Sequence, residues 1–475
     1  MDNIMSTINE IIGTLTGLIW GPWMLVALVG IGVYYTLRLG FFQLLRFPFV
    51  IKQTLGRAFL PESKIAGEGT LLPRQAASAA LSSTVGVGNI VGVASALLLG
   101  GPGAIVWMWI SAFFGMATKY AEIVLSIAYR EKDQNGIYHG GPAWYMKKGL
   151  KAPWLANIFT VCLAAVCLAG NMIQSNAIAG NVESVTTLDP LWTGLILMAL
   201  VAAVSVGGVR RLGKVTEKIV PIMVVFYLLG GIITILYHAT ALPEVIAGMF
   251  SSAFSLESVG GGVAGYAIME IIRYGVARGL YSNEAGMGTA PIAHASAKTD
   301  HPARQGMWGI TETFIDTFLV GTITALAILT SGVLTPESDA AILASQAFDT
   351  VVPGFRYIVS ISIVLFAFST IIAINYYGES MCFFLGGRRL SLAYRYIFLP
   401  FTVIGAIGGL KMIWSVSDLL FGLAVIPNLI AILLLSPKVI ALSKEFFQDI
   451  AVRERKQEQA DAKAKAQARS NAAGG

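Results

Sequence analysis

The chain has 475 residues, of which 55% are hydrophobic and only 13% are charged, and its mean hydropathy is +0.70. A soluble globular domain carries roughly 25% charged residues, so this composition excludes an ordinary soluble fold and favours a protein that lies in a lipid bilayer. The net charge of +6 does not indicate a nucleic-acid partner, because the basic residues cluster in alternate loops and in the tail and form no stripe along one face.

The chain contains about eleven apolar runs of the length that a membrane-spanning helix needs, which is roughly 20 residues. In chain order the expected spans are 18–37, 75–98, 103–129, 154–179, 191–207, 217–237, 245–277, 306–331, 355–381, 396–410 and 415–435. Between the first two, segment 41–59 interleaves Arg46, Lys52 and Arg57 with apolar residues. This segment is predicted to be an amphipathic helix at the membrane interface.

The loops between these spans alternate in charge. Lys and Arg crowd the loops 38–74, 130–151, 208–218, 273–304 and 386–395, whereas 180–190, 238–244 and 332–354 contain none. Cytoplasmic loops carry the excess of basic residues, so the amino terminus is predicted outside and the carboxyl terminus in the cytoplasm of a bacterial-type inner membrane. This orientation requires an odd number of spans, and eleven satisfies it.

Glycines interrupt two of the expected spans. The second span contains SSTVGVGNIVG at 82–92, and the seventh contains SVGGGVAG at 258–265. Glycine clusters permit a helix to unwind, and unwound backbone at bilayer depth must face protein or a watery cavity. Its free N–H groups suit a carboxylate and its free carbonyls suit a small cation such as sodium. The alternative is that these glycines only allow close helix packing.

The positions of the two interruptions predict the domain organisation. Without the first span, they fall in the first and sixth of ten spans, where two inverted five-helix repeats place corresponding elements. The expected parts are an extra amino-terminal helix with the interfacial helix in 1–74, the first repeat in 75–240, the second in 241–440 and a charged cytoplasmic tail in 441–475.

Several polar residues are expected at membrane depth. Gln174 and Asn176 lie in the fourth span, and Ser369 and Thr370 lie in the ninth. Amides can bind the polar atoms of an amino acid, and adjacent hydroxyls are good sodium ligands. Hydrogen bonding between helices is the alternative, and it is the preferred interpretation for Asn171.

The remaining polar and sulfur-containing side chains are interpreted as structural. Ion pairs within the protein are favoured over a proton relay for the charged residues at membrane depth. The three cysteines lie in apolar runs, which favours packing over disulfide or zinc chemistry, and the two histidines of the loop after the seventh span look structural. These residues are Lys119, Glu122, Glu270 and Glu379; Cys162, Cys167 and Cys382; and His294 and His301.

Motifs spread over most of the chain resemble those of the alanine or glycine:cation symporters, also called the sodium:alanine symporter family. The matching stretches are STVGVGNIVGVA (83–94), GGPGAIVWMWISAFFGMATKYAE (100–122), GNMIQSNA (170–177), IRYGVARGLYSNEAGMGTAP (272–291) and FAFSTIIAINYYGE (366–379). The SNEAGMG element is the most specific of them.

The resemblance implies an all-α polytopic membrane protein with a leucine-transporter-type (LeuT-type) 5+5 inverted-repeat bundle and one extra amino-terminal helix. It also implies a symporter, not an enzyme, that imports a small neutral amino acid by alternating access. Sodium is the expected coupling ion and no other cofactor or obligate protein partner is inferred; proton coupling and, less favoured, a channel remain alternatives. Concentrative uptake against a gradient separates a symporter from a channel.

The same resemblance implies the site. Backbone N–H groups of Val87 and Gly88 meet the substrate carboxylate, Gln174 contacts the substrate, and 262–267 forms a wall of the pocket. The residues expected to bind substrate are Gly86, Val87, Gly88, Asn89, Gln174, Gly262, Val263, Ala267, Thr370 and Ile374. Those expected to hold sodium are Thr84, Val85, Phe366, Ser369 and Thr370.

Three positions depart from the family pattern, which has threonine at Val87, phenylalanine at Val263 and tryptophan at Ile374. Two aromatic rings are therefore replaced by smaller groups at positions expected to line the side-chain pocket. Pocket volume changes selectivity by about 1–3 kcal/mol per methylene, so a substrate bulkier than alanine, such as glutamine, is one hypothesis. The alternative is that neighbours such as Tyr266 and Met269 refill the space.

Overall fold

The structure is a computed structural model of the chain, and it describes residues 2–254, 262–408 and 411–449. Nearly all of these residues are helical, as an apolar chain at bilayer depth requires, because a helix satisfies its own backbone hydrogen bonds. The strands of the described part are β1 (Glu131–Lys132) and β2 (Tyr138–His139), which pair antiparallel as a short hairpin.

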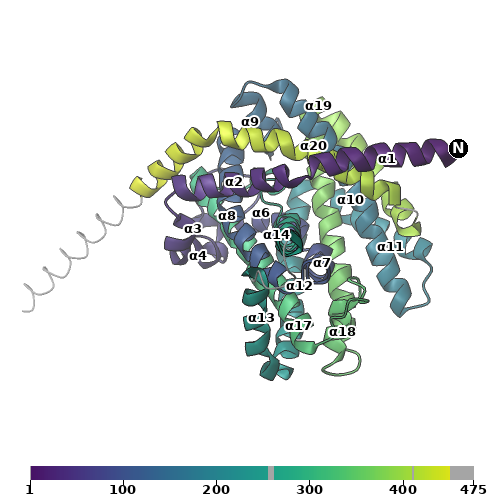
Figure 1. Cartoon of the computed structure of the whole chain (residues 1–475). Coiled ribbons are helices and arrows are strands. Elements are labelled where there is room, and N and C mark those ends of the chain that lie inside the picture. Colours follow the sequence, from purple (N-terminus) through teal and green to yellow (C-terminus); the bar gives the residue numbers. More distant parts are fainter. Residues whose placement is uncertain (1, 255–261, 409–410, 450–475) are drawn as a thin grey trace, which may run out of the picture.

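The helices of the first half of the chain include the long, buried α8, which packs mainly against helices of the second half (Figure 1). Their bounds are α1 (Asp2–Ile19), α2 (Pro22–Arg38), α3 (Phe42–Leu45), α4 (Phe47–Gln53), α5 (Leu55–Ala58), η1 (Glu62–Lys64), α6 (Pro73–Thr84), η2 (Val87–Asn89), α7 (Val91–Gly100), α8 (Gly103–Tyr129), α9 (Pro142–Lys148), α10 (Pro153–Val185), α11 (Pro190–Ser205) and α12 (Gly208–Tyr237).

The second half continues the helical bundle. Its elements are η3 (Ala239–Ala241), α13 (Leu242–Phe254), α14 (Gly262–Asn283), α15 (Ala290–His294), α16 (Pro302–Thr313), η4 (Phe314–Gly321), α17 (Thr322–Ser331), α18 (Leu343–Asp349), α19 (Arg356–Ile407) and α20 (Lys411–Leu434). The element η4 is a π-helix, which continues α16 into α17 with a wider turn.

Seven of the described helices are long and apolar enough to cross a membrane, and the bent pair α6 and α7 makes an eighth candidate. The span predicted at 103–129 coincides with α8. The helix α19 is continuous in hydrogen bonding but kinked, because Gly386 and Gly387 leave helical geometry and Gly387 has φ of +67°. This kink separates the two runs predicted at 355–381 and 396–410.

The run predicted as one span at 245–277 is divided. Helix α13 ends at Phe254 and α14 begins at Gly262, and residues 255–261 lie outside the described part of the chain. The first half of the predicted glycine interruption at 258–265 falls on these residues. From Gly262 onward the backbone is helical as far as Asn283.

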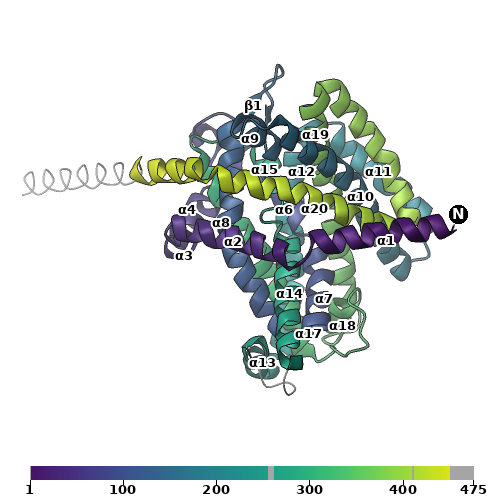
Figure 2. The same ribbon diagram turned by 45° about the horizontal axis from the view of Figure 1, so that its top comes forward.

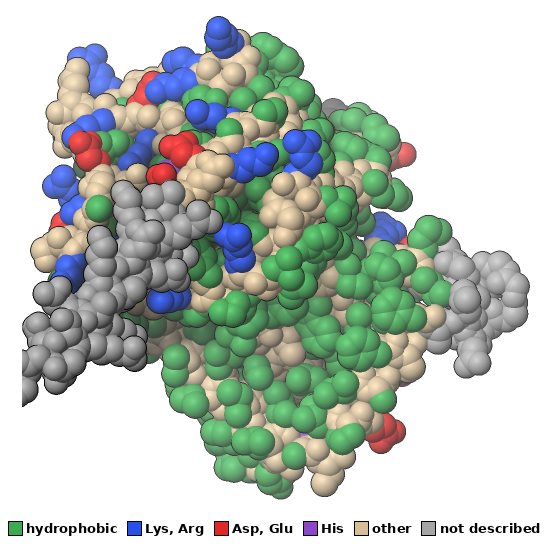
Figure 3. Space-filling model, turned by 90° about the vertical axis from the view of Figure 1, so that its left-hand side faces the viewer, with side chains coloured by type: hydrophobic (Ala, Val, Ile, Leu, Met, Phe, Trp, Pro, Cys, Tyr) green, Lys and Arg blue, Asp and Glu red, His purple; other side chains and the backbone are tan. Residues whose placement is uncertain are grey.

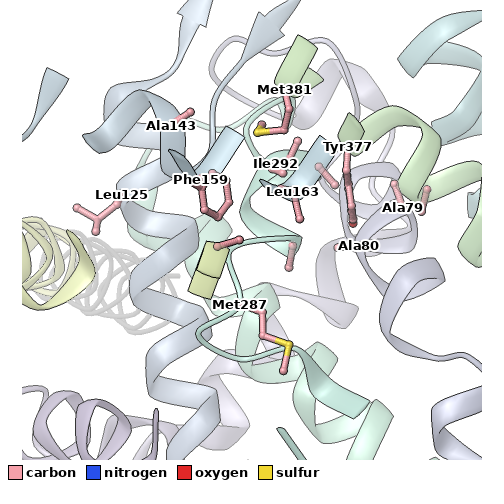
Figure 4. Packing of buried hydrophobic residues seen from close by; sticks show 14 of the residues in the cluster. Ala79, Ala80, Leu125, Ala143, Phe159, Leu163, Met287, Ile292, Tyr377 and Met381 are labelled. Atoms are coloured by element: carbon pink, nitrogen blue, oxygen red, sulfur yellow. The ribbon is translucent and has the colours of Figure 1, made fainter. Parts of the chain in front are cut away.

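Small residues bring the helices of the core close together. A Cβ atom on Gly275 of α14 would overlap the carbonyl oxygen of Ala104 in α8, and one on Gly279 would lie 2.5 Å from Ser111 Oγ. Only glycine fits at such distances, so α14 is held directly against α8. The apolar core is also closely packed elsewhere, for example where Tyr377 lies near Ala79 and Ala80 (Figure 4).

The two ends of the described chain lie against each other. Helix α1 runs beside α20 in both ribbon views (Figures 1 and 2), and Trp20 Nε1 donates a hydrogen bond to the carbonyl of Asp418, 2.9 Å away. Helical backbone continues after α20 as far as residue 449. Ser443 and Phe446 in this extension are buried, and Ser443 bonds to Tyr120 of α8 at 2.7 Å.

The segment predicted as an amphipathic helix at 41–59 is helical but divided into α3, α4 and α5. Arg46 and Thr54 interrupt it, and the Thr54 hydroxyl is buried and bonded to Thr311 at 2.9 Å. Phe42 packs on Tyr120, whereas Phe59 is 93% exposed. One face of this segment therefore lies on the bundle and the other is open.

Charge is segregated along the long direction of the molecule. On the face in Figure 3, Lys and Arg side chains gather over the upper part, and the lower part is mainly hydrophobic. The lower part holds α13 and α18 (Figure 1), next to the loops 238–244 and 332–354 that contain no basic residue.

Candidate functional site

The first helix break lies between α6 and η2 and confirms the interruption predicted within 82–92. The two halves of the span bend by 59°. Val85 and Gly86 have extended backbone, with φ/ψ of −77°/90° and −137°/−160°. The regular hydrogen-bond ladder stops here, so the last carbonyls of α6 and the N–H groups that follow lack helical partners.

Asn89 stabilises the first break through hydrogen bonds to three residues. Its Oδ1 accepts the N–H of Gly86 at 2.9 Å, and its Nδ2 donates to Ser282 Oγ at 2.9 Å and to Asp316 Oδ1 at 2.7 Å. Asp316 lies on η4, is fully buried and also accepts the hydroxyls of Ser282 and Thr317. Asn89, which was predicted to contact substrate, thus joins the break to α14 and η4 and is not among the residues that line the cavity described below.

A second break separates α14 from α15, at residues 284–289. Glu284, Gly286 and Gly288 all have left-handed backbone, with φ of +54°, +85° and +81°. A Cβ atom on Gly288 would lie 2.7 Å from Pro142 Cγ and 2.9 Å from the ring of Phe159, so glycine is required there. The break next to the first one is therefore in the SNEAGMG motif, about 20 residues beyond the predicted glycine cluster at 258–265.

Glu122 holds the second break in place. This fully buried carboxylate on α8 accepts the N–H groups of Gly286 at 3.1 Å and Gly288 at 3.0 Å, and the side-chain amide of Asn428 at 2.6 Å. The ion pair predicted for Glu122 is wrong, since in the described structure it bonds to backbone N–H groups and an amide. The break consequently replaces its missing helical acceptors with a side chain from another span.

The two breaks face one another across a cavity of about 110 Å³. Five parts of the chain contribute to its wall: the first break, α10, the end of α14 with the second break, α19 and α20. The lining residues are Ser83, Thr84, Gly86, Val87, Gly88, Leu163, Val166, Cys167, Gly170, Ile173, Gln174, Tyr281, Ser282, Glu284, Thr289, Thr370, Ile374, Tyr377, Trp414, Ser417, Asp418 and Phe421.

Sequence reasoning predicted six of these residues as substrate ligands, namely Gly86, Val87, Gly88, Gln174, Thr370 and Ile374, and Thr84 as a sodium ligand. It missed the residues of the second break and the polar face of α20. The available signal for the second break was the SNEAGMG motif, to which no role in the site was assigned. The sequence offered no comparable signal for Trp414, Ser417 and Asp418.

The first break presents free donors to the cavity. The N–H groups of Val87 and Gly88 make no backbone hydrogen bond to any other described residue. Gln174 Oε1 is buried and has no partner in the described structure. Unpaired polar groups are costly at this depth, so a polar ligand that bonds to them compensates that cost.

Oxygen atoms of α6 and α19 converge beside the same break. Thr370 Oγ1 lies 3.0 Å from the carbonyl of Ser82 and 2.9 Å from that of Phe366, and Ser369 Oγ lies 2.9 Å from Phe366 O. A Cβ atom on Gly86 would lie 3.2 Å from Thr370 Oγ1, so this approach depends on glycine. Val85 was also predicted as a sodium ligand. It directly follows α6 in the sequence, and its side chain is fully buried.

These hydroxyl and carbonyl oxygens fit a hard monovalent cation. Hydroxyl and carbonyl oxygens are the ligands that such cations prefer. The described residues contain no cluster of three His, Cys, Asp or Glu side chains that could hold a transition metal. The three cysteines are free and buried, which confirms packing as their role, although Cys167 also reaches the cavity wall.

The apolar end of the cavity lies between α10 and α19. Ile374 Cδ1 approaches Gly170 so closely that a Cβ atom there would be 3.1 Å away. Ile374 is thus packed onto α10 across the wall. An apolar cavity of roughly 150 Å³ is known to hold benzene, so the observed volume of about 110 Å³ suits a small ligand.

Three predicted pocket residues, Gly262, Val263 and Ala267, lie on the first turns of α14. Their side chains are outside the described part of the structure. Their backbone positions, however, are separated from Ser282 by 15 residues or more of continuous helix, which corresponds to about 22 Å or more along the axis. Because these side chains lie outside the described part of the structure, the prediction that 262–267 forms a wall of the pocket stays a prediction.

A buried charged network supports the second break from the side where basic residues gather. Lys119 and Glu312 are fully buried and lie 3.3 Å apart, which confirms the ion pair predicted for Lys119. Lys119 Nζ also donates to the carbonyl of Asn283, at 3.1 Å, where α14 ends. His294 bonds to Glu312 at 2.7 Å and to Gln305 at 2.8 Å, so its role is structural.

The other predicted structural contacts are also confirmed. Glu270 pairs with Arg273 at 3.3 Å, and Glu379 pairs with Arg395. The amide of Asn171 donates to the carbonyl of Phe398 at 2.8 Å, which is the expected bond between helices.

The sequence is similar to those of known transporters. The sequence profile described as the sodium:alanine symporter family matches residues 5–462. The sodium/alanine symporter AgcS of Methanococcus maripaludis is 44% identical over 92% of this chain and 97% of its own length. The uncharacterized transporter YflA of Bacillus subtilis is 45% identical over 90% of this chain and 91% of its own, and the probable sodium/glutamine symporter GlnT of the same organism is 37% identical over 92% and 91%.

The fold is shared with solved membrane transporters of low sequence identity. The crystal structure of MhsT in complex with L-phenylalanine superposes with a TM-score of 0.56, at 14% identity, and covers 79% of this chain and 93% of that chain. A mutant of the manganese transporter from Eremococcus coleocola superposes with a TM-score of 0.51, at 15% identity, over 81% and 83%. These likenesses show a fold of the leucine-transporter type.

Proposed function

Because the chain belongs to the sodium:alanine symporter family, we propose that it imports a small neutral amino acid together with a sodium ion by alternating access. The family is one of transporters, not of enzymes. The chain is accordingly a multi-pass membrane protein. The observation that carries the proposal is the cavity between two unwound segments, where free backbone donors of the first break and the oxygens beside Thr370 lie on one wall.

The proposed architecture has eleven spans, of which ten form two inverted five-helix repeats. Three features support the count beyond the eight candidates already given: α11 is a short apolar helix of 16 residues, α14 is a helix of 22 residues, and the kink at Gly387 divides α19 into two. The breaks again fall in the first and sixth of the ten spans, since the second lies at the end of α14. Helix α13 then lies outside the membrane-spanning set.

The proposed orientation has the amino terminus outside and the carboxyl terminus in the cytoplasm. The segregation of charge in Figure 3 supports it, because the basic end of the molecule is the one expected to face the cytoplasm. The plasma membrane of a bacterial-type cell is the proposed location.

Sodium coupling is proposed to act through the first break. A cation held by the hydroxyls of Ser369 and Thr370 and by carbonyls at the end of α6 would tie the unwound segment to α19. That contact fixes the N–H groups of Val87 and Gly88 in the direction that a carboxylate requires. By thermodynamic linkage, the substrate then raises sodium affinity by the same factor by which sodium raises substrate affinity.

For the substrate we propose an amino acid of the alanine and glycine class. The cavity volume and the packing of Ile374 against Gly170 support a small side chain. Glutamine is the second candidate, favoured by the absence of aromatic rings at Val263 and Ile374 and by the name of one relative.

Transport by the purified protein in vesicles tests the proposal. Labelled alanine is offered with an inward sodium gradient, with an inward proton gradient or with neither, and unlabelled glycine, alanine, leucine and glutamine compete. Accumulation above the external concentration with sodium alone supports the symporter. Accumulation with the proton gradient alone would replace sodium by protons, and mere equilibration under every gradient would indicate a channel.

A further inference from the structure

Glu284 is the acidic residue at the centre of the second break, and its backbone is strained. Its φ of +54° lies in the left-handed region, which a residue with a Cβ atom seldom adopts. Glycines at 286 and 288 supply the other left-handed positions of the same segment. A non-glycine residue kept in this conformation at the wall of a cavity indicates a functional requirement for its side chain.

The carboxylate of Glu284 has one occupied oxygen and one free oxygen. Oε2 accepts the hydroxyl of Thr289 at 2.5 Å and the hydroxyl of Ser83 at 3.3 Å. Oε1 accepts no hydrogen bond from any residue that the structure describes. Ser83 belongs to the last turn of α6, so the occupied oxygen links the second break to the first, and the free oxygen is left for the cavity that Glu284 lines.

The described wall of the cavity carries negative charge. It includes Glu284 and Asp418 and, among the described residues, no Lys, Arg or His. Lys119 supports the end of α14 but is bonded to Glu312 and to the carbonyl of Asn283, and no described basic group lies within 4 Å of the Glu284 carboxylate. A carboxylate whose free oxygen lies at the wall of a cavity favours a cationic group of the ligand at that position.

We propose that Glu284 binds the α-ammonium group of the transported amino acid through its free oxygen. This assignment rests on the proposed function and names the part of the substrate that the second break recognises. The first break offers N–H donors to the carboxylate and the second offers a carboxylate to the ammonium group, so the two unwound segments bind opposite charges of one zwitterion. The site should therefore reject hydroxy acids and monocarboxylates, which lack the ammonium group, and acidic side chains, which would meet Glu284 and Asp418.

The primary test compares Glu284→Gln with the wild-type protein in competition against labelled alanine uptake. Glutamine is close in shape and can still bond to Ser83 and Thr289, so the fold should be kept. A charge-assisted hydrogen bond lost at a buried site corresponds to about a 10- to 100-fold loss of affinity, and the half-saturating alanine concentration should rise by that factor. Lactate, which has a hydroxyl in place of the ammonium group, should compete poorly in the wild-type protein and no more poorly in the variant, so the preference for alanine over lactate should shrink. Glu270→Gln on α14, the helix before Glu284, is away from the cavity lining; it is the matched control and should leave both the alanine and the lactate results unchanged.

Two further measurements separate the ways in which the assignment could fail. Sodium binding without amino acid should survive in Glu284→Gln; its loss would make Glu284 a cation ligand and overturn the proposal, as would wild-type alanine affinity in this variant. If the variant does not fold, the wild-type protein is tested with alanine betaine, whose trimethylated nitrogen keeps its charge but cannot donate: competition equal to that of alanine would overturn the proposal. Failure of the proposed function would differ from all of these, because the wild-type protein itself would not accumulate alanine.

Discussion

Two amides three residues apart on α10 illustrate how similar side chains serve different purposes. Asn171 is fully buried and bonded to the Phe398 carbonyl, to Ser175 and to Thr402. Gln174 lines the cavity with an unpaired Oε1. The amide of Asn171 thus makes its hydrogen bonds within the protein, whereas the Oε1 of Gln174 remains available to a ligand.

Replacing each amide by leucine should therefore have opposite effects on stability. Gln174→Leu removes an unpaired buried acceptor, so the empty protein should gain up to about 1 kcal/mol while alanine affinity falls. Asn171→Leu leaves three partners unpaired and should cost about 2–3 kcal/mol. Thermal unfolding in detergent and alanine competition measure both quantities. A loss of stability in Gln174→Leu would contradict the idea that its oxygen is kept for the substrate.

At Gly86 a single methyl group should disturb the cation site. Its φ and ψ are extended and open to alanine, but the new Cβ would lie 3.2 Å from Thr370 Oγ1. Gly86→Ala should raise the half-saturating sodium concentration with little loss of folding. Gly92→Ala, in the same span with no atom within 4 Å of the added Cβ, is the control and should be neutral or slightly stabilising, by less than about 1 kcal/mol.

The hydroxyl of Thr370 can be tested by Thr370→Val, which keeps the branched shape and removes one oxygen. Losing one ligand of a charged partner should raise the half-saturating sodium concentration by about 10-fold or more. Thr216→Val is the matched control, because the Thr216 hydroxyl is equally buried but bonds only within its own helix, to Leu212 and Gly213. Unchanged sodium dependence in both variants would remove Thr370 from the ion site.

At the scale of single elements, the second break depends on a carboxylate from another helix. Glu122→Gln would place an amide donor where the N–H of either Gly286 or Gly288 now finds an acceptor. The unfolding free energy should fall by about 2–3 kcal/mol, together with alanine affinity, because the segment that carries Glu284 loosens. Glu183→Gln on the exposed part of α10 controls for the loss of charge. Normal stability and alanine affinity in Glu122→Gln would show that the second break does not depend on the Glu122 carboxylate.

The contrast between the two breaks explains what the sequence could predict. The first break follows from a local property, the clustering of Gly86, Gly88 and Gly92, and it was predicted correctly. The break at 284–289 was not predicted, because it is made by tertiary contacts: Glu122 and Lys119 on α8 supply the partners that residues 284–289 lose. Contacts between residues more than 160 positions apart leave no pattern in a single sequence.

The site shows the same division. Gln174, Thr370 and Ile374 were predicted from their motifs and reach the cavity. Asn89, equally close to a glycine, faces the other way, toward Asp316, because the direction of a side chain at a break depends on backbone angles that a sequence does not specify. The position of Glu284 at the cavity was not predicted, since a carboxylate within a sequence motif does not indicate which cavity it faces.

At the scale of the whole molecule, the proposed orientation can be tested by labelling. Glu337 lies in the loop without basic residues and Gln134 in the hairpin at the basic end, and both are exposed. With a membrane-impermeant maleimide, Glu337→Cys should react in intact cells and Gln134→Cys only after permeabilisation. The native cysteines are buried, so background should be low. The reverse pattern would invert the protein in the membrane.

The π-helix η4 has a consequence for the way in which this span tolerates change. Beyond it, Thr322 accepts the indole N–H of Trp109 at 2.8 Å and Thr324 bonds to Tyr227 at 2.8 Å, while Asp316 within it faces Asn89. Deleting one residue would allow an ordinary α-helix but would rotate everything that follows by about 100° relative to Asp316. The wide turn sets the rotation of the helix beyond η4 relative to Asp316. A version of 314–321 with one residue fewer or more could therefore keep the contact of Asp316 with Asn89 or the contacts of Thr322 and Thr324, but not both.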